Sequence, residues 1–183
     1  MLLIELVKYQ KQLDSKVLEL QKPNLDDYHL LIARKTALVS EYFEFLNETK
    51  LFKYWTNKEI ELEKLYEEFI DLVHFTLSLL YIYQLADELG TKYSLGTTSS
   101  DSRENLFLKA QKDNRLRVEL LNINYDWIRE IYSAIEKNNF AEWLGWLSQI
   151  SIWLALTGEE IKKRYLVKWQ KNFERLGVVF NSL

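Results

Sequence analysis

Acidic residues on two neighbouring segments have the types and spacing needed to hold a divalent cation. In SEYFEFLNE, Glu41, Glu44 and Glu48 stand at i, i+3 and i+7, and in YEEFIDLVHF, Glu68 and Asp71 repeat the i, i+3 step. On a helix, each set would project from one face. Carboxylate oxygens are the ligands that Mg²⁺ prefers, and clustered acids would repel one another without a cation. The alternative is an ordinary solvent-exposed acidic face.

Polar side chains also share helix faces near both ends of the chain. Gln10 and Asp14 lie one turn apart on a face that also carries leucines, so both need hydrogen-bonding partners there, unless they mark its exposed edge. Near the other end, four residues fall within about 80° around a helix: Tyr165, Lys168, Asn172 and Arg175. Lysine and arginine on one stripe can bind phosphates, although such a stripe is also typical of a solvated basic face.

The elements that must position these residues are predicted to be helices. The chain of 183 residues has one proline and five glycines, too few for the frequent turns of a β fold. We expect one all-α domain over residues 1–183, a helical bundle with a flexible Gly/Ser/Thr-rich loop at about 90–102. The apolar periodicity predicts helices over residues 2–21, 27–50, about 59–88, 103–120, 123–137, 139–156 and 158–175.

Composition excludes several classes of function. The chain has no cysteine, which rules out disulfides and thiolate chemistry, and two histidines are too few for a histidine-rich zinc site. With 24 basic and 27 acidic residues, it lacks the basic surface of a nucleic-acid binder. No membrane span or signal peptide is predicted, so we expect a cytoplasmic protein. An aromatic content of 14% suits a large core and a subunit interface.

Several motifs together resemble the dimeric all-α dUTPases, a family of the all-α NTP pyrophosphatase superfamily that occurs in certain bacteria, phages and trypanosomatids. The family has E-x-x-E, an F-K-x-W-type segment, then E-x-x-D followed by His-Phe. This chain has Glu41 and Glu44, the segment 52–55, then Glu68 and Asp71, with the His-Phe pair at 74–75. The resemblance covers about residues 6–17, 31–85 and 160–178.

The resemblance implies Mg²⁺-dependent hydrolysis of dUTP to dUMP and diphosphate, which removes dUTP from the DNA precursor pool. Two or three Mg²⁺ ions would bind the carboxylates of Glu41, Glu44, Glu68 and Asp71, with Glu48 behind them. Glu41 would orient or deprotonate the attacking water. The remaining site residues would bind substrate: Gln10, Asp14, Lys53, Trp55, His74, Tyr165, Lys168, Asn172 and Arg175.

The same resemblance implies a homodimer. Charge and hydropathy indicate a cytoplasmic protein, in the host cytoplasm if the chain is phage-encoded, with no nucleic-acid or membrane partner. Two other functions fit the residues. One is a pyrophosphatase of the same superfamily with broader NTP specificity. The other is a helical interaction protein without catalysis. An enzyme that also binds a regulatory protein would fit both descriptions.

Overall fold

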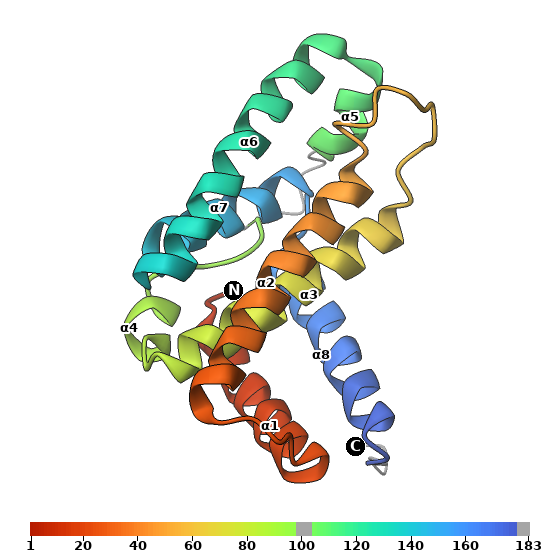
Figure 1. Cartoon of the computed structure of the whole chain (residues 1–183). Helices are drawn as coiled ribbons and strands as arrows, with labels where there is room; N and C mark the ends of the chain where they lie inside the picture. Colours follow the sequence, from red (N-terminus) through yellow and green to blue (C-terminus); the bar gives the residue numbers. More distant parts are fainter. Residues whose placement is uncertain (98–103, 179–183) are drawn as a thin grey trace.

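The computed structural model describes residues 1–97 and 104–178, and these form an all-helical fold (Figure 1). Its helices are α1 (Ile4–Gln21), α2 (Asp27–Thr49), α3 (Leu62–Ile82), α4 (Ala86–Gly90), α5 (Leu106–Lys112), α6 (Asn114–Lys137), α7 (Phe140–Trp153) and α8 (Gly158–Arg175). The described residues contain two isolated β-bridges and no strand. The predicted all-α class is confirmed.

Side-chain caps explain where several helices begin. The Asp26 carboxylate accepts a hydrogen bond from the backbone N–H of His29 and starts α2. Asp113 caps α6 in the same way. Thr157 and Glu160 form a reciprocal capping box at the start of α8, the helix that carries the basic stripe.

Two predicted boundaries are wrong. The helix predicted over 59–88 ends at Ile82, because Gln84 adopts a left-handed conformation (φ 59°) that separates α3 from the short α4. The predicted break near residue 121 does not exist; the break lies at Asp113, whose side chain caps α6 immediately after α5 ends. No glycine or proline marks either point, so the sequence carried little signal for them.

Helix α3 lies at the centre of the fold and packs against α1, α2, α4 and α8. Figure 1 shows α2 and α3 side by side, with α1 and α8 at one end of the molecule and α5, α6 and α7 toward the other. Large buried rings fill the interior between these layers: Tyr42, Phe45, Phe69, Phe107, Trp127 and Trp143. This packing fixes the rotation of α3, and with it the direction of its acidic face.

Part of the predicted flexible loop lies outside the described residues, namely 98–102. The preceding residues are held in place: Ser94 forms a β-bridge with Leu2, and Thr97 one with Thr157. Leu95 is fully buried. Among the described helices, none has the length and apolarity needed to cross a membrane.

Candidate active site

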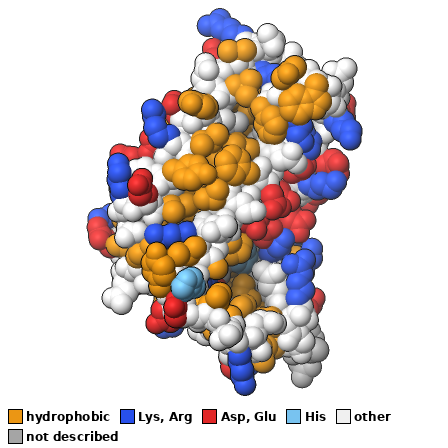
Figure 2. All heavy atoms as spheres, viewed as in Figure 1, with side chains coloured by type: hydrophobic (Ala, Val, Ile, Leu, Met, Phe, Trp, Pro, Cys, Tyr) orange, Lys and Arg blue, Asp and Glu red, His pale blue; other side chains and the backbone are white. Residues whose placement is uncertain are grey.

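Three carboxylates from α2 and α3 converge on one point. Oxygens of Glu41, Glu44 and Glu68 all lie within 4.8 Å of one another. Glu41 and Glu68 are half-buried, whereas Glu44 is exposed at the rim. Figure 2 shows acidic side chains gathered on the face where α2 and α3 meet, with basic side chains beside them. The i, i+3 spacing puts Glu41 and Glu44 on one face of α2, and the packing of α2 against α3 brings Glu68 to them.

The electrostatics of this cluster favour protons or a cation. Burial raises the pKa of Glu41 from its ordinary 4.5 to about 7, and repulsion from Asp71, Glu44 and Glu68 adds to the shift. Burial likewise raises the pKa of Glu68 to about 6, again with help from neighbouring acids. A hard divalent cation would remove this repulsion, so the donor set fits Mg²⁺.

The fourth predicted ligand, Asp71, is hydrogen-bonded to a lysine. Its Oδ2 atom lies 2.6 Å from the Nζ atom of Lys168, which also bonds Glu67 at 2.9 Å. Burial raises the pKa of Asp71, and the hydrogen bond with Lys168 opposes that shift. Lys168 thus places one positive charge at the edge of the acidic cluster. Glu48 does not belong to the group of three converging carboxylates. Its own carboxylate pairs with the Lys50 ammonium at 3.0 Å.

A cavity of about 540 Å³ lies beside the acids, between α1, the start of α2, α3 and the end of α8. Six of the residues predicted to form the site line it: Gln10, Asp14, Asp71, His74, Asn172 and Arg175. Apolar side chains such as Leu13, Val17 and Phe75 form much of the remaining wall. A nucleotide base needs this combination of an apolar slot and a few polar groups.

Buried polar groups form a continuous network at the inner end of the cavity. The Gln10 Nε2 atom donates to Asp14 Oδ1 at 2.9 Å. The other carboxylate oxygen of Asp14 pairs with Arg34 at 2.8 Å and accepts a hydrogen bond from Ser78 at 2.7 Å. Arg34 also contacts the Ser78 hydroxyl. Both carboxylate oxygens of Asp14 therefore have hydrogen-bonding partners, although the residue is only 7% exposed.

Two rings cover the other side of Gln10. The His74 imidazole stacks on the Tyr165 ring, with 4.0 Å between centroids and 14° between planes. His74 Nδ1 and the Tyr165 hydroxyl each lie 2.7 Å from Gln10 Oε1. Tyr165 is completely buried, so its hydroxyl serves this internal contact. Burial lowers the pKa of His74 to about 3, with repulsion from Lys168 adding to it, so the ring is neutral.

The segment between α2 and α3 presents Lys53 and Trp55 elsewhere. Both line a separate surface depression, together with Glu48 and Lys50, and neither lines the 540 Å³ cavity. Trp55 is 63% exposed. Within the single chain, these two residues therefore stand apart from the network around Gln10.

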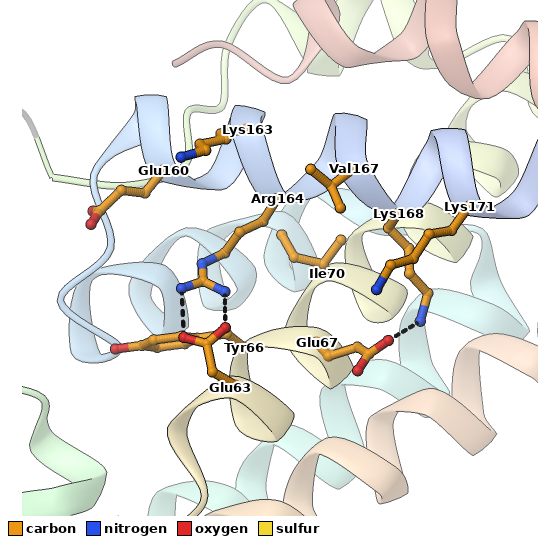
Figure 3. Close-up of a pocket in the computed structure, with 10 residues that line it drawn as sticks. All are labelled: Glu63, Tyr66, Glu67, Ile70, Glu160, Lys163, Arg164, Val167, Lys168 and Lys171. Atoms are coloured by element: carbon orange, nitrogen blue, oxygen red, sulfur yellow. Dashed lines mark hydrogen bonds and ion pairs between the residues drawn. The ribbon is translucent and has the colours of Figure 1, made fainter. Parts of the chain in front are cut away.

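A second groove runs along the outer side of α3 and α8 (Figure 3). Arg164 holds Glu63 with two hydrogen bonds of 2.8 and 3.0 Å, and Lys168 reaches Glu67. These ion pairs bind α8 to α3. They hold α8 in a position where Lys168 and the following turns of the helix face the acidic cluster.

The sequence interpretation missed two members of the network, Arg34 and Ser78. Arg34 lies seven residues before Glu41, so both fall on one face of α2. An arginine directly after the apolar run LLIA was the available signal. Ser78 stands within the apolar part of α3, where a buried hydroxyl needs a partner.

Comparison with known proteins finds one family. A family model described as dUTPase matches residues 2–178 of the chain. No curated protein and no solved structure matches it.

Proposed function

The chain belongs to the dUTPase family, and from this premise we propose that its α2–α3 acids and the adjoining cavity form the catalytic site. Its activity is that of a dUTP diphosphatase, which hydrolyses dUTP to dUMP and diphosphate. The observation that carries the site assignment is spatial. Asp71 lines a cavity of a size suited to a nucleotide base, and it lies close enough to Glu41 and Glu68 of the acidic cluster to raise the pKa of both.

The proposed ligands of two or three Mg²⁺ ions are Glu41, Glu44, Glu68 and Asp71. The raised pKa values of Glu41 and Glu68 support this, because burial and neighbouring acids raise both values although Lys168 acts to lower them. When bound, Mg²⁺ would neutralise phosphate charge and make a water more acidic. Glu41 would orient that water or accept its proton on a carboxylate oxygen.

Phosphate binding is proposed for the basic end of α8. Arg175 and Asn172 line the cavity next to Asp71, and Lys168 stands one turn earlier on the same face. Lys168 would turn from Asp71 toward a phosphate oxygen when substrate enters. Lys53 and Trp55 are proposed to reach substrate from the α2–α3 segment, and their separation from the cavity within one chain fits a contribution in an assembly.

The base would occupy the cavity between α1 and α3. Gln10 and Asp14 lie on its wall and form a donor and an acceptor side by side. A pyrimidine with a carbonyl next to an N–H matches that pair. Apolar side chains around them would cover the ring faces and exclude water.

A homodimer is proposed through the face formed by α2 and α6. Large apolar side chains on this face are exposed, including Phe43 and Tyr125, which are 43% and 76% exposed. Figure 2 shows hydrophobic side chains across it. A second copy seated there would cover this apolar surface and lie beside Glu44.

The test of the site is a product assay with purified protein, dUTP and Mg²⁺. Glu44→Gln should lose at least a hundredfold in kcat, because a ligand charge is removed while the exposed side chain costs the fold little. EDTA should stop the wild-type reaction, and added Mg²⁺ should restore it. Glu142→Gln, an acidic residue on α7, is the matched control and should keep full activity. Near-wild-type turnover by Glu44→Gln would remove the cluster from the mechanism.

A further inference from the structure

The carboxamide of Gln10 is held in one orientation by its neighbours. A carboxylate can only accept hydrogen bonds, so the Gln10 atom 2.9 Å from Asp14 Oδ1 must be the amide nitrogen. The carbonyl oxygen then faces the opposite way, toward His74 and Tyr165. Both of its lone pairs are used there, at 2.7 Å each.

This orientation also determines the tautomer of His74. A carbonyl oxygen cannot donate, so the hydrogen between His74 Nδ1 and Gln10 Oε1 must sit on Nδ1. The Tyr165 hydroxyl donates to the same oxygen. The stacked pair of rings therefore presents two donors to one acceptor, and all three residues are at most 4% exposed.

We propose that Tyr165 and His74 are positioning residues that lock the Gln10 carboxamide and so make the cavity select uracil over cytosine. With its carbonyl oxygen saturated, Gln10 offers the cavity only its second amide N–H. Asp14 Oδ1, next to it, offers an acceptor. This inference rests on the proposed placement of the base in the cavity.

The selection follows from the edges of the two bases. Uracil presents a carbonyl oxygen beside N3–H, an acceptor next to a donor, which matches the donor of Gln10 and the acceptor of Asp14. Cytosine presents an amino group beside an unprotonated N3, the reverse order. Its N3 would face the acceptor Asp14 Oδ1, and to accept from its amino group Gln10 would have to rotate by half a turn. Its amide nitrogen would then face two donors and its oxygen would face the Asp14 carboxylate.

Nothing in the network allows that rotation at low cost. Asp14 is anchored by Arg34 and Ser78, so it stays an acceptor. His74 keeps its single proton, since burial holds its pKa far below neutrality. To follow a flipped amide, His74 would have to move its proton to Nε2, a buried atom with no hydrogen-bond partner among the described residues, and the Tyr165 hydroxyl would have to turn from donor to acceptor. These costs build the discrimination into the fold before substrate arrives.

Tyr165→Phe tests the lock because it removes one hydroxyl and keeps the stacked ring. We expect the ratio of kcat/KM for dUTP to that for dCTP to fall by roughly three- to tenfold, the loss of one hydrogen bond. Tyr42→Phe is the matched control: it removes another fully buried hydroxyl, which bonds the Asn124 carbonyl oxygen at 3.1 Å. Its ratio should equal that of the wild type.

A third variant separates this inference from the placement of the base. Gln10→Ala should lower the same ratio more than Tyr165→Phe does. If Gln10→Ala leaves the ratio unchanged, the base lies elsewhere and the proposed site is wrong. If Gln10→Ala lowers the ratio while Tyr165→Phe does not, the base is placed correctly and the lock is overturned.

The tautomer of His74 gives a test without substrate. The chain has only two histidines, so ¹⁵N-histidine labelling yields two ring systems, and His29→Gln identifies them. We expect His74 to show a protonated Nδ1, an unprotonated Nε2 and no titration from pH 8 down to pH 5. A proton on Nε2 instead of Nδ1 would overturn the assigned orientation of Gln10.

Discussion

Replacing Glu41 with glutamine should stabilise the metal-free protein at neutral pH. The carboxyl of Glu41 has a pKa of about 7 in the folded chain and an ordinary value of 4.5. Between these values the folded state binds more protons than the unfolded state, so this group makes stability fall as pH rises from about 4.5 to about 7. Above pH 7 the full penalty persists. Glutamine keeps the shape of the side chain and removes the charge.

The size of the effect follows from the shift. At about 1.4 kcal/mol per pKa unit, the change from 4.5 to about 7 corresponds to roughly 3 kcal/mol. Glu41 is only half-buried, and solvent screening reduces this to about 1–2 kcal/mol. For a chain of this length, each kcal/mol raises the melting temperature by about 2–4 °C.

The assay is thermal unfolding in EDTA at pH 7.5 and at pH 4, followed by far-UV circular dichroism. Glu41→Gln should melt higher than the wild type at pH 7.5 and at the same temperature at pH 4. Glu63→Gln is the control with the opposite sign, because its hydrogen bonds with Arg164 lower the pKa of Glu63. Excess Mg²⁺ should reverse the order by stabilising the wild type more. A variant that melts no higher than the wild type at pH 7.5 would refute the repulsion inferred for the cluster.

Two further predictions concern substrate binding and assembly. Lys168→Met should lower kcat/KM for dUTP by about 10- to 100-fold through the loss of a charged hydrogen bond. The same variant should bind Mg²⁺ more tightly in calorimetry, because Asp71 is released from its bond with Lys168. Lys163→Met, on the same helix with its side chain in the outer groove, should change neither, and equal effects of both variants would contradict the role of Lys168. The wild type should sediment as a dimer, and Tyr125→Lys should shift it toward monomer; a wild-type monomer at all concentrations would contradict the proposed α2–α6 interface.

The acidic cluster could be predicted because its spacing is a local property. Glu41 and Glu44, like Glu68 and Asp71, share a helix face whatever the rest of the chain does. The sequence also pointed to the buried face that holds Gln10 and Asp14. These relations depend on 3.6 residues per turn and on which side chains are apolar, and both can be read from neighbouring residues.

Other features depended on how the helices pack. The sequence placed Tyr165 and Lys168 on one stripe of α8, and the family resemblance implied contact with substrate for both. In the structure, α8 is rotated so that Tyr165 is fully buried against His74, while Lys168 reaches Asp71. Three residues along a helix turn the chain by about 300°, so these two side chains point in different directions. The crossing angle of α8 with α3 decides which of them enters the core.

The amino-acid sequence by itself determined the helical class, the positions of most helices and the pairing of acids on two of them, because each is set by local periodicity and composition. Only the tertiary structure decided which charges meet. Arg34 pairs with Asp14, and Tyr165 bonds Gln10 across 155 residues of chain. Such contacts depend on the rotation and crossing of packed helices, which hundreds of van der Waals contacts in the core set together.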